Sequence, residues 1–231
     1  MEFSPAEVTA ILLSLKVAAW SVAASLPLAV AVGYLLARSD FPGKTLFDAL
    51  VHLPLVLPPV VIGFLLLLLF GRNGALGAAL DRWFGIVVAF RWTGAALAAA
   101  IMGFPLMVRA IRLSVAAVDR RLEAAARTLG ASPTRTFLTI TLPLAAPGII
   151  TGALLSFARS LGEFGATITF VSNIPGETQT LPLYIYGATQ IPGGDWQALR
   201  LSLVAVVLSL AALAASEWLT RRASPGRSIV Q

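Results

Sequence analysis

Five long stretches of apolar residues, separated by polar segments, dominate the sequence. The hydrocarbon core of a bilayer is about 30 Å thick, and a helix needs roughly 20 apolar residues to cross it. The stretches cover about residues 8–37, 46–70, 92–108, 144–161 and 199–219. The pattern therefore predicts one all-α domain over residues 1–231, a polytopic membrane helical bundle with about five transmembrane helices.

Helix-breaking residues modify two regions of this pattern. The second stretch contains Pro54, Pro58 and Pro59, which predict a kink. Residues 164–190 are moderately apolar but interrupted, so short helices or loops are expected there rather than a sixth full span. The interrupting residues are Asn173, Pro175, Gly176, Pro182 and Gly187. A bundle of six spans remains the alternative.

The composition is typical of a membrane protein. Only 12% of the residues are charged and 58% are hydrophobic, which excludes an ordinary soluble globule and an intrinsically disordered chain. The absence of cysteine and the presence of a single histidine, His52, exclude a disulfide scaffold and leave little for metal chemistry, so no metal site is expected. The formal net charge of +6 is compatible with either nucleic acid or anionic lipid as a partner.

Lys and Arg are concentrated in alternate loops, which predicts the topology. Residues 38–44, 109–135 and 221–227 contain two, six and three of them, whereas residues 71–91 contain three and residues 160–199 contain none. Cytoplasmic loops carry an excess of these residues. We therefore expect a multi-pass protein with its amino terminus outside, its carboxyl terminus in the cytoplasm and membrane lipid, not nucleic acid, as its surroundings.

The most informative polar segment is the loop at about residues 119–135, ahead of the fourth stretch. Leu122, Ala126 and Leu129 recur there at helical spacing, and Gly130 is a typical helix end. The loop is therefore expected to contain a short helix.

This short helix has features of a docking element. Ala124, Ala125 and Ala126 give it a small surface that a partner's groove can approach closely, and Glu123 and Arg127 are spaced to pair across its solvated face. The alternative is a surface helix that only tethers two spans, with arginines that set the topology and contact anionic lipid.

The order of residues in the loop resembles the EAA loop of ABC importer permeases. The resemblance rests on Glu123, Ala124, Ala125, Gly130, Ile140, Leu142 and Pro143. Glu123 precedes Gly130 by seven residues, one more than the family's commonest spacing. In that family the loop seats a short helix in a cleft of a cytosolic ATP-binding subunit, here about residues 120–132. The coupling residues implied are Arg121, Glu123, Ala124, Ala125, Arg127, Gly130, Ala131 and Ser132.

Three further segments resemble stretches of molybdate and sulfate permeases, namely residues 41–44, 52–61 and 161–166. The resemblance implies a type I importer permease in the bacterial inner membrane, with a cytoplasmic coupling helix in the loop at 119–135. It further implies a cytosolic ATP-binding subunit dimer, a periplasmic molybdate-binding protein and a second copy of the chain as partners. Such a complex would carry molybdate, or tungstate, inward by alternating access. Five spans and a compact length favour the molybdate type over sulfate or thiosulfate permeases.

The chain lacks an ATPase motif of its own. Gly43-Lys44-Thr45 resembles part of a phosphate loop, but the motif needs a glycine at position 38, which is Arg. The acidic residues are scattered, so neither an enzyme nor a cofactor is expected, and ATP would be bound by a partner subunit. An ion-coupled secondary transporter is the less favoured alternative, because repeated halves are not evident.

Arg159 and Glu163 are the ionisable residues predicted to lie at membrane depth. Four residues apart on a helix, they can neutralise each other as a structural pair. Gly162 and Gly165 can break the helix, and irregular backbone at membrane depth is tolerated where it is buried or faces water. The translocation pathway is therefore predicted at Arg159, Glu163, Phe164 and Gly165, and the structural pair remains the alternative.

Overall fold

The computed structural model describes residues 3–223, which form helices joined by short loops. The predicted all-α fold is confirmed for this part of the chain. Residues 224–227 of the basic segment at 221–227, and the carboxyl terminus, lie outside the described residues. The helices are α1 (Pro5–Arg38), α2 (Lys44–Val56), α3 (Pro59–Phe70), α4 (Ala75–Phe84), α5 (Trp92–Ala116), α6 (Arg120–Thr128), α7 (Pro133–Thr136), a π-helical turn (Phe137–Thr141), α8 (Leu142–Leu161), α9 (Gly165–Val171), α10 (Leu181–Thr189) and α11 (Asp195–Ala223).

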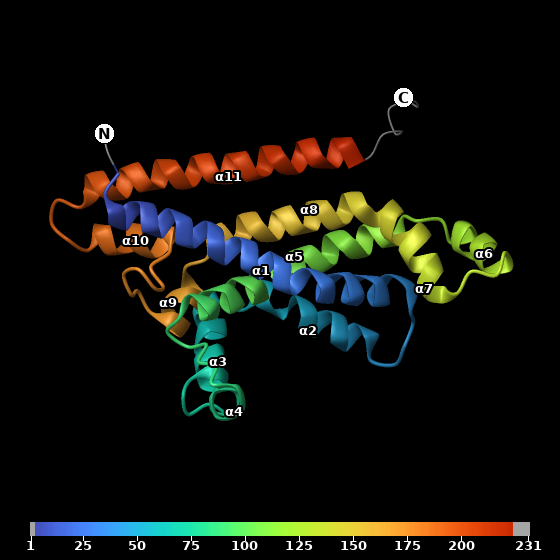
Figure 1. Cartoon of the computed structure of the whole chain (residues 1–231), viewed down its shortest axis with the longest axis horizontal. Coiled ribbons are helices and arrows are strands. Elements are labelled where there is room, and N and C mark those ends of the chain that lie inside the picture. Colours follow the sequence, from blue (N-terminus) through green and yellow to red (C-terminus); the bar gives the residue numbers. More distant parts are fainter. Residues whose placement is uncertain (1–2, 224–231) are drawn as a thin grey trace.

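Long helices that run along one axis form the bundle. Figure 1 shows α1, α5, α8 and α11 side by side, with α6 and α7 at one end and α10 at the other. By length and apolar composition, four helical segments of the described chain can cross a membrane, and the number is five if the bent pair of α2 and α3 is counted as one span. Small residues bring the helices close together. A Cβ atom on Gly33 of α1, for example, would lie 2.8 Å from Cγ2 of Ile111 in α5.

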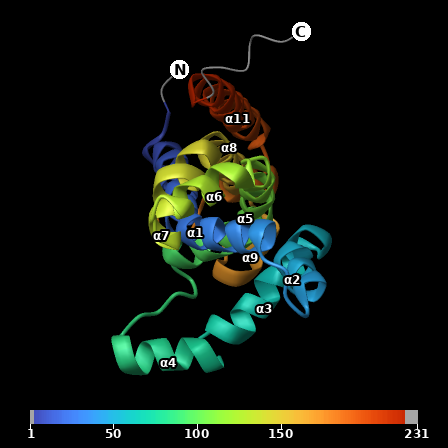
Figure 2. The same ribbon diagram turned by 90° about the vertical axis from the view of Figure 1, so that its right-hand side faces the viewer.

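The second predicted span is broken rather than kinked. Helices α2 and α3 meet at an angle of 111°, because Leu57 is extended ahead of Pro58 and a new helix begins at Pro59. As a result the axis of α3 runs across the long axis of the bundle. Helices α3 and α4 therefore project from the bundle (Figure 2).

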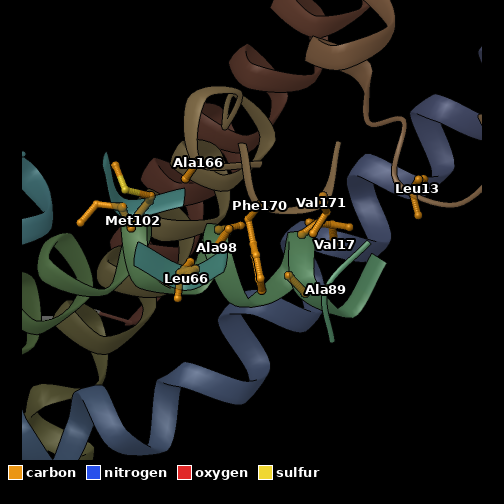
Figure 3. Close-up of a cluster of buried hydrophobic side chains, with 13 residues drawn as sticks. Leu13, Val17, Leu66, Ala89, Ala98, Met102, Ala166, Phe170 and Val171 are labelled. Carbon is orange, nitrogen blue, oxygen red and sulfur yellow. The ribbon is translucent and has the colours of Figure 1, made fainter. Parts of the chain in front are cut away.

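Two hydrophobic clusters occupy the two halves of the bundle. In the first, Phe170 and Val171 of α9 pack among residues of α1, α3 and α5 (Figure 3). The second contains Leu36, Met107 and Ile111 near the α6 end. Between them, Ser21 halfway along α1 contacts Ser160 of α8, with 3.0 Å between their Oγ atoms. Ser160 therefore lies near the middle of the bundle's height.

The interrupted segment at 164–190 folds as expected, into the short helices α9 and α10 and their loops. Ser14 of α1 holds the start of α10, because its Oγ accepts a hydrogen bond from the Leu181 amide at 2.6 Å. In the described residues no sixth helix reaches the length and hydropathy of a span.

Candidate functional site

Helix α6 is a separately capped helix at one end of the bundle. Asp119 caps it by accepting a hydrogen bond from the Arg121 amide at 2.9 Å. The helix ends before Gly130, whose φ of 85° lies in the left-handed region that favours glycine. Ser132 then caps α7. The predicted short helix and the role of Gly130 as its end are therefore confirmed.

Glu123 does not pair with Arg127 across a solvated face, as the spacing suggested. That expectation was wrong, because the Glu123 side chain points into the bundle and is buried. Its Oε1 accepts hydrogen bonds from Nη2 of Arg38 at 3.0 Å and from Oγ1 of Thr141 at 2.6 Å. Arg38 belongs to α1 and Thr141 to the π-helical turn that leads into α8. One carboxylate thus joins α6 to two long helices.

Most of the other residues predicted for coupling lie on the exposed side of the loop. Ala131 is half-buried, and the exposed residues are Arg121, Ala124, Ala125, Arg127, Gly130 and Ser132. The sequence interpretation missed Leu122 and Leu129, which it treated only as the helix's apolar stripe. Leu129 is 89% exposed and Leu122 is 48% exposed. Exposed apolar residues beside a small-residue surface are typical of an interaction site, and their seven-residue spacing, two helical turns, was the available signal.

The second predicted site centres on an ion pair at mid-height whose carboxylate is buried. Nη1 of Arg159 lies 2.6 Å from Oε2 of Glu163, whose side chain is 2% exposed. The other carboxylate oxygen of Glu163 accepts a hydrogen bond from the Ala166 amide at 2.9 Å, in the first turn of α9. The neighbouring Ser160 contacts the middle of α1, so the pair lies near the centre of the bundle's height. The ion pair that the four-residue spacing allows between Arg159 and Glu163 is therefore present.

The break between α8 and α9 lies directly against the break between α2 and α3. A Cβ atom on Gly165 would lie 2.8 Å from Cβ of Pro59, and one on Gly63 would lie 2.5 Å from the Ala166 carbonyl oxygen. Glycine is needed at both positions because the backbones approach so closely. Sequence reasoning predicted a kink at the prolines and a break at Gly162 and Gly165, but not their contact, since no local pattern links residues so far apart in the chain.

Phe164 lies beside a cavity next to this break. Its ring packs on Tyr186 of α10 with centroids 5.0 Å apart. The cavity of about 460 Å³ lies between the end of α8, α10 and α11, with a mostly apolar lining that includes Gly162 and Ser209. No cluster of three or more His, Cys, Asp or Glu side chains that could hold a metal occurs in the described part of the chain.

Comparison with known proteins identifies a family and close relatives in sequence. The family described as "binding-protein-dependent transport system inner membrane component" matches residues 29–225. The chain is 60% identical to the molybdenum transport system permease protein ModB of Escherichia coli (strain K12) over 92% of its own length and 93% of that protein. It is 59% identical to ModB of Haemophilus influenzae over 94% of each chain.

The fold has a counterpart among solved structures. A chain of the bacterial alginate ABC transporter, solved in complex with an alginate pentasaccharide-bound periplasmic protein, matches with a TM-score of 0.74. The identity is 16%, and the match covers 95% of this chain and 80% of that chain. The family model and the identity to the molybdenum transport permeases show that the chain belongs to the family of binding-protein-dependent transport system inner membrane components.

Proposed function

We propose that this chain is the membrane-spanning subunit of an ATP-driven importer that carries molybdate inward across the bacterial inner membrane. The observation that carries the proposal is the 60% identity, over 92% of the chain, to a molybdenum transport permease. Tetrahedral molybdate, tungstate and sulfate have the same charge, so we assign discrimination among them largely to the binding protein that delivers the ion.

The proposed partner on the cytoplasmic side is a dimer of ATP-binding subunits. The sequence has no phosphate-binding loop of its own. The exposed residues of α6 include Leu122 and two alanines, and the exposed Leu129 follows the helix directly. Movement of α6 by the ATP-binding subunits would reach α1 through Arg38 and α8 through Thr141, because both side chains are hydrogen-bonded to Glu123. Glu123 is thus a positioning residue that ties the docking helix to the bundle.

The proposed topology places α6 in the cytoplasm and the amino terminus outside. Six arginines lie in residues 109–135 and none lies in residues 160–199, which is the bias expected for cytoplasmic and external segments. The end of the bundle that carries α10 and the start of α11 would then receive the external binding protein, as the alginate transporter receives its periplasmic protein.

The proposed passage runs past the two facing helix breaks, between this chain and a second copy. Arg159 offers a positive charge at mid-height, and Glu163 balances it. A strong anion site would retain the ion, so a neutralised arginine suits a conduit that must release what it attracts. The projecting arm of α3 and α4 exposes Phe64, Leu68 and Trp83, which supports an apolar contact beyond this bundle.

Uptake by the reconstituted complex tests the proposal. The chain would be co-expressed with the ATP-binding subunit, reconstituted in liposomes and supplied with the binding protein and labelled molybdate. We expect ATP-dependent accumulation that excess tungstate reduces and excess sulfate reduces far less. Failure to co-purify with an ATP-binding subunit, or uptake that ignores ATP and follows an ion gradient, would overturn it. Uptake that a sulfate-binding protein supports and a molybdate-binding protein does not would instead assign the chain to sulfate transport.

A further inference from the structure

A second cavity, separate from the mid-height site, lies where the end of α1 meets α6. It has a volume of about 520 Å³, and its lining is more polar than that of the cavity beside Phe164. Figure 1 shows that the end of α1 and α6 lie at the same end of the bundle. Its lining residues are Tyr34, Arg38, Ser39, Arg120, Glu123, Ala124 and Arg127.

The charges in this cavity do not balance. Arg38 and Glu123 neutralise each other through their ion pair at 3.0 Å, which leaves the positive charges of Arg120 and Arg127. These two arginines lie seven residues apart on α6, two helical turns, and so share one face. Asp40, in the loop after α1, is hydrogen-bonded to Lys44 at 2.8 Å and does not line the cavity. The Lys44 hydrogen bond and, to a smaller extent, the Arg120 charge lower the pKa of Asp40, so Asp40 offsets part of the Arg120 charge.

One buried donor of a lining residue also lacks an acceptor. The Arg38 side chain is only 8% exposed. Its Nη2 donates to Glu123 and to the Val118 carbonyl oxygen, but its Nε–H is buried without a hydrogen-bond partner. A buried N–H group without an acceptor is costly. An anion with several oxygens, bound among the three guanidinium groups, would supply the acceptor and the missing negative charge.

We propose that this cavity binds a tetrahedral oxyanion, either the phosphate of an inner-leaflet phospholipid headgroup or a free oxyanion from the cytoplasm. The bound anion bridges Arg38 of α1 and Arg120 and Arg127 of α6. It therefore adds a second link between α6 and the bundle beside the Glu123 carboxylate, and its loss loosens that link. The binding itself is independent of transport; only its effect on ATP-driven coupling rests on the proposed function.

Two binding measurements on the purified complex with its ATP-binding subunit test this site and distinguish the sources. In the first, calorimetry follows inorganic phosphate binding to nucleotide-free, delipidated complex. In the second, native mass spectrometry counts the phosphatidylglycerol retained from vesicles of phosphatidylethanolamine and phosphatidylglycerol. Arg120→Gln and Arg127→Gln remove charges that line the cavity. Arg121→Gln is the matched control, because Arg121 is exposed on the same helix but does not line the cavity.

We expect the complexes with Arg120→Gln and Arg127→Gln to bind either phosphate or phosphatidylglycerol about tenfold more weakly than the complex with Arg121→Gln. A difference of this size is typical of the loss of a charge-assisted hydrogen bond. A difference with phosphatidylglycerol identifies the lipid, and a difference with phosphate identifies a free oxyanion. If lining and control variants behave alike in both measurements, the proposal is wrong, whether because the cavity holds no anion or because an acidic side chain of the ATP-binding subunit fills it. Neither result depends on uptake, so failure here is distinct from failure of the proposed function.

Discussion

At the scale of single residues, Glu123 links three elements through one carboxylate oxygen. The i, i+4 spacing suggested Arg127 as its partner, but Arg38 and Thr141 lie 85 and 18 residues away in the chain. Helical spacing indicates only which neighbours on one helix can meet. It therefore predicted the Arg159–Glu163 pair correctly and failed for Glu123, whose partners come from tertiary packing.

Glu123→Ala is expected to destabilise the chain because it leaves the Arg38 guanidinium buried without its partner. Removing one member of a buried ion pair costs about 3 kcal/mol. The variant should therefore unfold at a lower temperature, and its ATP hydrolysis should persist while molybdate uptake falls. In a double-mutant cycle, Arg38→Met combined with Glu123→Ala should recover part of the stability. If the losses of stability of the two single variants simply add in the double variant, Arg38 and Glu123 are not energetically coupled.

Glu163→Gln tests whether Arg159 faces the passage. Removing the negative charge leaves the arginine unbalanced at mid-height, so the variant should hold an oxyanion longer. We expect uptake with both a lower KM and a lower kcat. If the pair is only structural, the melting temperature falls while KM stays unchanged, and this result would remove Arg159 and Glu163 from the pathway.

At the scale of elements, the two helix breaks support each other. The prolines at 58 and 59 and the glycines at 162 and 165 each signal an interruption. The 111° bend was not predictable from them, because it depends on α3 packing against α9 at Gly63 and Ala166. A proline removes a helical hydrogen bond but does not set the direction of the next helix.

Gly165→Ala should disturb this contact, because the added Cβ would lie 2.8 Å from Cβ of Pro59. Gly162→Ala is the matched control, since the nearest atom to its Cβ, the Arg159 carbonyl oxygen, is 4.0 Å away. We expect a melting temperature several degrees lower for Gly165→Ala than for Gly162→Ala, with a parallel loss of uptake. Equal melting temperatures would show that α9 does not pack tightly on the α2–α3 break.

Gly130→Ala tests the loop after α6. An L-residue in the left-handed region costs about 1–2 kcal/mol, and Gly43 has a similar φ of 82° with equally open surroundings. Both alanine variants should therefore lose similar stability. Only Gly130→Ala should also weaken co-purification with the ATP-binding subunit. An equal effect of the two substitutions on co-purification would argue against a docking role for this loop.

At the scale of the whole molecule, apolar stretches and the distribution of Lys and Arg predicted the class of protein, the approximate spans and the short helices between the fourth and fifth stretches. These features follow from local composition and from the thickness of the bilayer. The arrangement of the helices and the cavity between α1 and α6 depend on contacts between distant residues, such as Arg38 with Glu123. Such contacts leave no periodic signal in a single sequence.

The central claim is that α6 lies in the cytoplasm and contacts an ATP-hydrolysing partner. The chain contains no cysteine, so Leu129→Cys introduces a single thiol at a nearly fully exposed position. In intact cells we expect this thiol to resist a membrane-impermeant maleimide and to cross-link to the ATP-binding subunit. Gln190→Cys, at an exposed position beside the end of α10, should react with the maleimide from outside. Labelling of Leu129→Cys from outside, or the absence of any cross-link to an ATP-binding subunit, would contradict the account.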